Sequence, residues 1–171
     1  MKYWIPGLMV FIIFACHNNI PRPQEKEMPI PGDTSLNGVS GNLIMTPEEM
    51  KDDSVFSDGS IPTSWKTSGI NDGLQLKIFI KFLRNWVEQG NKDSIASHIK
   101  YPLNSKIHTP SDFLRQYEEV FNAKVIHALN QQNLSQIFRN QQGAMIGNGE
   151  LWIRNISPGL TDDFKIVSIN Y

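Results

Sequence analysis

The chain has 171 residues, a formal net charge of −1 and a single cysteine. This length fits one domain with a hydrophobic core, and one cysteine excludes an internal disulfide. Residues 66–171 carry twelve basic and nine acidic side chains, a net charge of +3. The basic residues are scattered and are not interleaved with aromatics, which argues against nucleic-acid binding. A mild attraction to anionic surfaces, such as lipid headgroups or cell-wall polymers, fits this charge.

Residues 1–15 have the layout of a secretory signal peptide. Lys2 supplies a positive charge, residues 5–14 are almost wholly apolar, and Ala15 is small. The apolar run is about ten residues long, whereas a membrane-spanning helix needs roughly 20. A stable transmembrane anchor is therefore the weaker interpretation.

The end of this signal carries a motif with a known counterpart. The stretch Ile12-Ile13-Phe14-Ala15-Cys16 resembles the lipobox of bacterial lipoproteins. The resemblance implies that Cys16 becomes the lipidated first residue of a protein anchored to a bacterial membrane. His17, rather than Asp, follows the cysteine, which resembles outer-membrane sorting in Gram-negative bacteria. The alternative is an ordinary signal peptide with an unrelated cysteine.

Residues 16–65 read as a lipid-anchored, mostly disordered tether. Six of the ten prolines lie between residues 17 and 65, and such a composition buries too little apolar surface to offset the entropy of ordering. Thr46-Pro47-Glu48-Glu49 predicts a short helix with a capping box. We interpret it as a transient helix in a flexible tether, with docking through the apolar residues 43–45 as the alternative.

The domain is expected to begin with a long helix from Asn71-Asp72 to about Gln89, ended by Gly90. Its apolar residues cover most of the circumference, so most of the helix is expected to be buried. The central apolar stripe comprises Leu74, Ile78, Phe82 and Trp86, widened by Leu76, Phe79, Ile80, Leu83 and Val87. The solvent-facing side is predicted to be marked by Lys77, Lys81, Arg84 and Glu88.

The elements that follow are shorter. We expect a helix over residues 93–98, a strand over residues 99–103 and a helix capped by Thr109, with a second helix over residues 123–129. The apolar face of the Thr109-capped helix would be Phe113, Tyr117, Val120 and Phe121.

The last forty residues predict antiparallel strands. Asn148-Gly149 between two apolar runs predicts a hairpin, with a bulge in one long strand as the alternative. The last strand is expected to contain Phe164, Ile166, Val167 and Ile169.

Helices followed by antiparallel strands predict an α+β domain over residues 66–171. This order, together with residues 99–103, 112–117 and 143–152, resembles the NTF2-like cone-fold domains over about residues 71–171. The resemblance implies a curved antiparallel sheet packed on a long helix, with a conical pocket between them. NTF2-like proteins include both enzymes and binding modules, so the fold alone does not decide the function.

Four residues are candidates for the lining of such a pocket: Tyr101, Asp112, Glu150 and Trp152. Strand alternation predicts that Glu150 and Trp152 share a face. On a pocket-facing side, apolar neighbours would raise the pKa of Glu150 and make it the best candidate for a general base; the alternative is a solvated hairpin residue. Asp112 is preferred as the cap of its own helix, and the two aromatic residues are either ligand walls or core.

Metal and cofactor chemistry find little support in the sequence. His98, His108 and His127 are not at metal-ligand spacing, so no metal site is predicted. No cofactor motif is present either, because Gly147-x-Gly149 follows a strand without a helix to supply a dipole.

Three functions remain. The preferred one is a non-enzymatic binding module in the cell envelope, which takes a protein or envelope component and would include inhibitor or immunity proteins. The alternatives are an NTF2-like enzyme or small-ligand binder that uses a pocket carboxylate, and a structural envelope protein.

Overall fold

The computed structural model describes residues 43–157, 159 and 162–171. All of these residues belong to one of the chain's two units, Leu36–Tyr171. The predicted signal peptide, Cys16 and the first part of the predicted tether lie outside the described residues.

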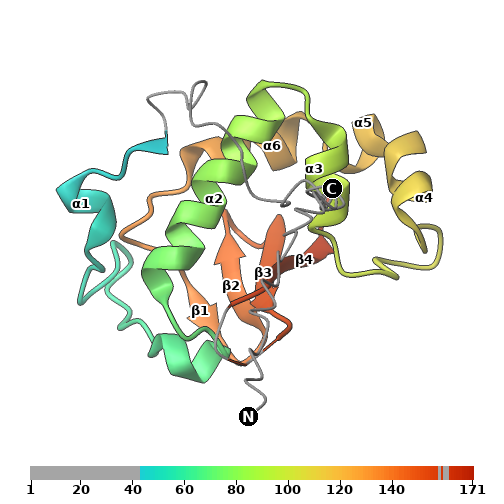
Figure 1. The fold of residues 1–171 in the computed structure, drawn as a ribbon. Coiled ribbons are helices and arrows are strands. Elements are labelled where there is room, and N and C mark those ends of the chain that lie inside the picture. Colours follow the sequence, from blue (N-terminus) through green and yellow to red (C-terminus); the bar gives the residue numbers. More distant parts are fainter. Residues whose placement is uncertain (1–42, 158, 160–161) are drawn as a thin grey trace, which may run out of the picture. The chain divides into compact units, whose positions relative to one another are not determined.

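The described chain is an α+β fold, as predicted, with helices first and strands last (Figure 1). The helices are α1 (Pro47–Met50), the 3-10 helix η2 (Trp65–Ser68), α2 (Gly73–Glu88), α3 (Lys92–Ser97), α4 (Pro110–Arg115), α5 (Tyr117–Val120) and α6 (Ala123–Gln131). The strands are β1 (Arg139–Asn140), β2 (Gly143–Ile146), β3 (Leu151–Asn155) and β4 (Phe164–Ile169).

Local signals in the sequence set most of these helix boundaries. Thr46 and Thr109 both form capping boxes, with Glu49 and Asp112 respectively. Asp72 caps α2 by accepting the Leu74 N–H at 2.8 Å. The helices predicted after residues 72 and 122 and over residues 93–98 are confirmed, whereas the single helix predicted after Thr109 is divided at Gln116 into α4 and α5.

The strands form one open antiparallel sheet in the order β1-β2-β3-β4. The predicted hairpin is confirmed, because β2 and β3 pair on either side of residues 147–150. Gly147 and Gly149 have positive φ angles of 64° and 106° there, which glycine adopts readily. A register shift falls between Trp152 and Ile153, where β3 pairs with β4.

The strand predicted over residues 99–103 is wrong. Only Ile99 makes a bridge, an isolated parallel one with Ile166 of β4. Around it, the Lys100 N–H donates to Ile166 O at 2.9 Å and the Ile166 N–H donates to His98 O at 2.7 Å. Pro102 has no N–H to continue the ladder, so the segment pairs with β4 for one step and then turns away.

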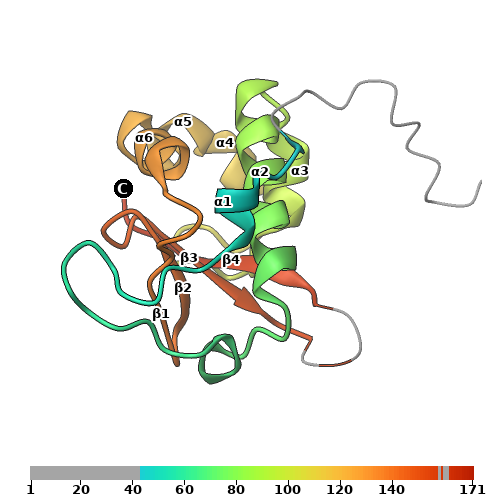
Figure 2. The ribbon, with the colours of Figure 1, turned by 90° about the vertical axis from the view of Figure 1, so that its left-hand side faces the viewer.

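The hydrophobic core lies on one face of the sheet. Burial alternates along β3, where Leu151, Ile153 and Asn155 are buried and Arg154 is exposed. The buried face of the sheet packs with α2 and α6, and the helices gather on that side of the strands (Figure 2). The opposite face of the sheet is the more exposed one.

Residues 43–65, assigned above to the tether, pack against the domain instead. Lys77 on α2 donates to Glu49 O at 3.0 Å and to Lys51 O at 2.7 Å. Arg139 on β1 donates from Nε to Thr63 O at 2.6 Å and stacks over the Trp65 ring at 3.9 Å. The predicted short helix therefore forms as α1 in a docked segment, which was the alternative interpretation.

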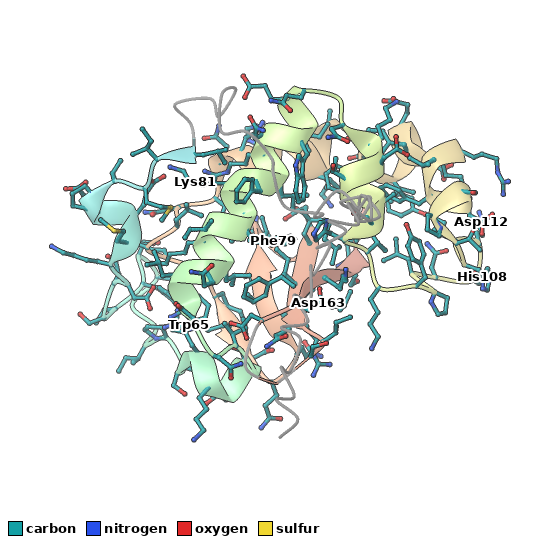
Figure 3. All side chains as sticks on the ribbon, in the orientation of Figure 1. Trp65, Phe79, Lys81, His108, Asp112 and Asp163 are labelled. Atoms are coloured by element: carbon teal, nitrogen blue, oxygen red, sulfur yellow. The ribbon has the colours of Figure 1, made fainter. Side chains whose placement is uncertain are left out.

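This docked segment also buries two lysines of the predicted solvent-facing side of α2, whereas the predicted core residues Leu76, Ile80 and Leu83 are buried as expected. Lys77 is 1% exposed and Lys81 is buried as well, although both were expected to face solvent. Lys81 donates to Ile44 O at 2.6 Å and pairs with Glu49 at 2.7 Å, and Figure 3 shows its side chain on the side of α1. Two lysines are buried because carbonyls and carboxylates of the docked segment supply the partners that a buried ammonium requires.

Candidate functional site

Three of the four residues predicted as the centre of the apolar stripe of α2, Ile78, Phe82 and Trp86, line a surface groove, and Leu74 lies outside it. Leu74 is 36% exposed and Phe82 is 40% exposed. The groove has a volume of about 550 Å³ and is called the α2 groove below. Its lining residues are Asn71, Asp72, Gln75, Ile78, Phe79, Phe82, Trp86, His98, Asp162 and Phe164.

Rings make up much of this groove. Trp86 stacks on His98, with ring centroids 4.7 Å apart, and on Phe82, with centroids 6.1 Å apart. Phe79 packs its ring 5.4 Å from His98 and 5.7 Å from Phe164. Aromatic pairs in these geometries hold one another in place, so the groove is a preformed apolar wall rather than a set of independent surface side chains.

One end of the groove is polar and acidic. Asp162 accepts the Asn71 amide at 2.8 Å and the Asp72 N–H at 3.1 Å, and it also accepts the Asn155 amide. These bonds hold Asp162 against the start of α2. None of the described lining residues is Lys or Arg, so the two carboxylates give this end a negative potential.

His98 links the groove to α3. Its Nδ1 lies 2.8 Å from Ser94 O, and because a carbonyl only accepts, Nδ1 carries the proton. This bond fixes the ring orientation at the end of α3 and leaves Nε2 as the second polar atom of the ring. The groove can therefore hold a ligand with an apolar body and a hydrogen-bonding or cationic end.

Glu150 lies elsewhere, in a cavity of about 730 Å³ beside α6, which Lys124 and His127 also line. It belongs to the turn before β3 rather than to the strand, and its carboxylate accepts the Asn148 N–H at 2.6 Å. Burial acts to raise the pKa of Glu150, but the N–H donors of Asn148 and Glu150 and the charge of Lys124 outweigh it, so the pKa lies below its usual range. The raised pKa expected of a general base in this position is not found.

Trp152 lies on the other face of the sheet. It lines a hollow of about 450 Å³ together with residues of β4 and of the loop after α3. The prediction that Glu150 and Trp152 share a face is wrong, because strand alternation does not extend into a turn whose glycines have positive φ angles.

Tyr101 and Asp112 are occupied by local contacts. The Tyr101 hydroxyl donates to Ala96 O at 3.0 Å, and burial, followed by the charge of Asp112, raises its pKa to about 12. Asp112 accepts from Thr109 Oγ1 at 2.9 Å, and this bond and the His108 N–H lower the pKa of its carboxyl. The preferred interpretation of Asp112 as a helix cap is confirmed, and Figure 3 places it with His108 far from Phe79.

The structure thus does not gather the four candidate pocket residues in one cavity, and the α2 groove was missed. A signal for the groove was present in the sequence. Apolar residues on most of the circumference of one helix exceed what one sheet face can cover, so part of that surface had to face a neighbouring segment or solvent. Among the described residues, no cluster of His, Cys, Asp and Glu could hold a metal ion.

Comparisons of the chain with protein-family models, with curated proteins and with solved structures found no match. Within the part of the chain that the structure describes, the helices are too short or too polar to cross a membrane.

Proposed function

We propose that the protein is an exported, lipid-anchored binding module of the bacterial cell envelope, and that the α2 groove is its ligand site. The observation that carries this proposal is the exposed aromatic face of α2. A stripe of large apolar side chains on a long helix is ordinarily core, and here it lines a groove with one acidic end. Concave apolar surfaces with a few converging polar groups are typical of ligand sites.

The groove suggests the kind of ligand. The rings of Phe82 and Trp86 offer a wall for an apolar side chain or lipid-like group, and Asp72 and Asp162 offer acceptors at one end. A peptide segment or envelope component with an apolar body and a basic or amide-bearing end fits this pattern. Aromatic faces also attract cations directly, which favours a basic end over an acidic one.

The cellular location in this proposal is inferred from the sequence. The lipobox-like stretch ending at Cys16 supports lipidation and export, and the outer membrane is the proposed location in a Gram-negative cell. The chain between Cys16 and Leu43 has 26 residues. At about 3.3–3.6 Å per residue it reaches at most roughly 90 Å from the anchor.

The NTF2-like assignment belongs to the proposal as well. It is supported by the order of elements and by an antiparallel sheet that packs one face on a long helix. In this assignment the cone would be filled by the core of the protein, with the ligand on the outside of α2.

The experiment is a retention assay with residues 17–171, the chain without its signal peptide and Cys16. It is immobilised through its C-terminus and exposed to solubilised envelope of the source cell. We expect a component that is retained by the wild type and lost from Phe82→Asp. The matched control is Ile61→Asp, because Ile61 is 78% exposed and lies outside the groove. Equal retention by Phe82→Asp, or retention of nothing by the wild type, would overturn the proposal.

A further inference from the structure

The exposed face of the sheet carries a feature that the α2 groove does not use. We propose that this face is a docking surface for an anionic lipid membrane. The inference goes beyond the ligand site, and it does not require the lipid on Cys16, although the anchored membrane would be the natural partner. The surface is called the sheet face below and consists of Phe138, Met145, Trp152, Arg154, Val167 and Lys100.

An apolar row crosses the sheet face from strand to strand. Met145 pairs with Trp152 across β2 and β3, and the Met145 N–H donates to Phe138 O at 2.8 Å. Phe138 is 40% exposed and meets the Trp152 ring edge-on, with centroids 6.5 Å apart. Residues paired in an antiparallel sheet point to the same face, so these three side chains form one row on the side opposite the core.

Basic residues flank this row. Arg154 is exposed on β3, two positions after Trp152. Lys100 is exposed and follows Ile99, which pairs with β4 and faces the core, so Lys100 points to the other side. The hollow around Trp152 includes both Lys100 and Arg154 among its lining residues, and no Asp or Glu.

The acidic residues nearest in sequence to this surface are already paired. Glu150, two positions before Trp152, lies 3.7 Å from the Lys124 ammonium in the cavity beside α6. Asp163 forms an ion pair with Lys165 at 3.3 Å, and Lys165 also donates to Ser97 O at 3.0 Å. The charges of Asp163 and Lys165 therefore offset each other. The unbalanced charge of the sheet face is positive, in contrast to the acidic end of the α2 groove.

This combination favours a lipid surface over other anionic partners. Trp and Phe side chains partition to the headgroup level of bilayers, and neighbouring Lys and Arg add attraction to anionic headgroups. A single-stranded nucleic acid would need a basic track along several bases, whereas here two basic residues border one short apolar row. A sheet face lying on the membrane would leave the α2 groove on the helix side, accessible to its ligand.

The test is co-sedimentation of residues 17–171 with vesicles. This chain retains every residue that the structure describes and lacks both the apolar segment 5–14 and the acylated thiol. The vesicles are equimolar phosphatidylglycerol and phosphatidylcholine, or phosphatidylcholine alone, at low salt. We expect several-fold stronger binding to the anionic vesicles, and weaker binding at high salt because ions screen the attraction.

The variants separate this surface from net charge. Arg154→Glu should weaken binding to anionic vesicles about tenfold or more, since each basic residue near such a surface contributes about a fivefold factor. Lys51→Glu changes the net charge equally on the segment that covers α2, and it should change binding less than threefold. Trp152→Ala should weaken binding to the vesicles while the salt dependence persists. Lys100→Glu repeats the charge-reversal test at a second exposed basic residue of the sheet face.

Three outcomes would overturn the inference: equal losses from Arg154→Glu and Lys51→Glu, no preference for anionic vesicles, or binding to an oligonucleotide but not to vesicles. The α2 groove is tested separately, because Phe82→Asp should leave vesicle binding unchanged. If the envelope-retention assay fails while vesicle binding is intact, the proposed ligand site is rejected and the proposed membrane surface is retained.

Discussion

Two faces of helix α2 have environments that their residues do not suggest. The lysine face is buried, with Lys77 and Lys81 bonded to carbonyls and carboxylates of residues 44–52. The aromatic face, with Phe82 and Trp86, borders an open groove. The difference teaches that a side chain's environment depends on what lies opposite it. A polar, proline-containing segment covers the lysine face because its backbone supplies acceptors, whereas His98 and Phe164 cover the aromatic face only in part and leave Phe82 40% exposed.

The largest expected effect tests whether the docked segment belongs to the fold. The chain 66–171 lacks the acceptors of Lys77 and Lys81, and it also loses Phe56, which is buried. We expect this chain to lose cooperative unfolding, because two ammonium groups and apolar surface become exposed at once. The chain 43–171 should unfold at the same denaturant concentration as 17–171. Circular dichroism in urea measures both, and cooperative unfolding of 66–171 with unchanged stability would contradict the docking.

The second prediction concerns Lys77 alone. Lys77→Ala removes the donor to Glu49 O and Lys51 O and the partner of Asp52, which lies 2.8 Å from the ammonium. We expect a loss of about 3 kcal/mol in the free energy of unfolding, because partners of a buried charge are left unpaired. Exposed Lys66→Ala should change it by less than about 0.5 kcal/mol. Urea titrations at neutral pH compare the two, and equal values would show that the lysine face is not buried in solution.

The third prediction uses pH. Burial acts to raise the pKa of Glu49, but the bond to Lys81, the Thr46 N–H and nearby positive charges lower it below its usual value of 4.5. A lowered folded pKa means that ionised Glu49 stabilises the fold above pH about 4.5 and that this contribution is lost as the pH falls through the folded pKa. Glu49→Gln should therefore show a shallower loss of stability below pH 4.5.

The measurement is the urea midpoint as a function of pH, with exposed Glu48→Gln as the control. Asp112 and Glu150 also have lowered pKa values. Part of the loss of stability at acidic pH should therefore persist in Glu49→Gln. If the urea midpoint of Glu49→Gln falls below pH 4.5 as steeply as that of the wild type, a stabilising role for the Glu49–Lys81 pair is excluded.

The smallest stability effect is expected on the aromatic face. Phe82→Ser should change the free energy of unfolding by less than about 1 kcal/mol, because the ring is 40% exposed and contacts Trp86 on one side. The next residue, Leu83, faces the core, and Leu83→Ala should lower the free energy of unfolding by about 3 kcal/mol. A loss at Phe82 equal to that at Leu83 would mean that the α2 groove is filled in solution.

Short-range signals predicted much of this fold. The capping threonines 46 and 109 and the Asn148-Gly149 turn each act over a few residues, and each appears in the structure. The error on the solvent-facing side of α2 involves partners distant in sequence. The lysine face of α2 was misjudged because its partners lie 25–37 residues away, in a segment whose composition resembles a linker.

The candidate site was harder to predict for the same reason. Glu150 was placed with Trp152 by strand alternation, but the turn directs its carboxylate toward the Asn148 N–H and Lys124 of α6. Asp112 was correctly preferred as a cap, because that interaction lies within four residues. The α2 groove depends on His98, Asp162 and Phe164 meeting α2, and no local pattern specifies that meeting.

The single bridge between Ile99 and Ile166 has a consequence for self-association. Outer strands of an open sheet offer unpaired backbone groups that can recruit other chains. Here the outer side of β4 is bonded to residues 98 and 100, and two-residue β1 exchanges bonds with Thr63 through the Arg139 side chain and carbonyl. Each border of the sheet thus has part of its backbone occupied by a neighbouring segment, which hinders edge-to-edge association of two copies of the chain.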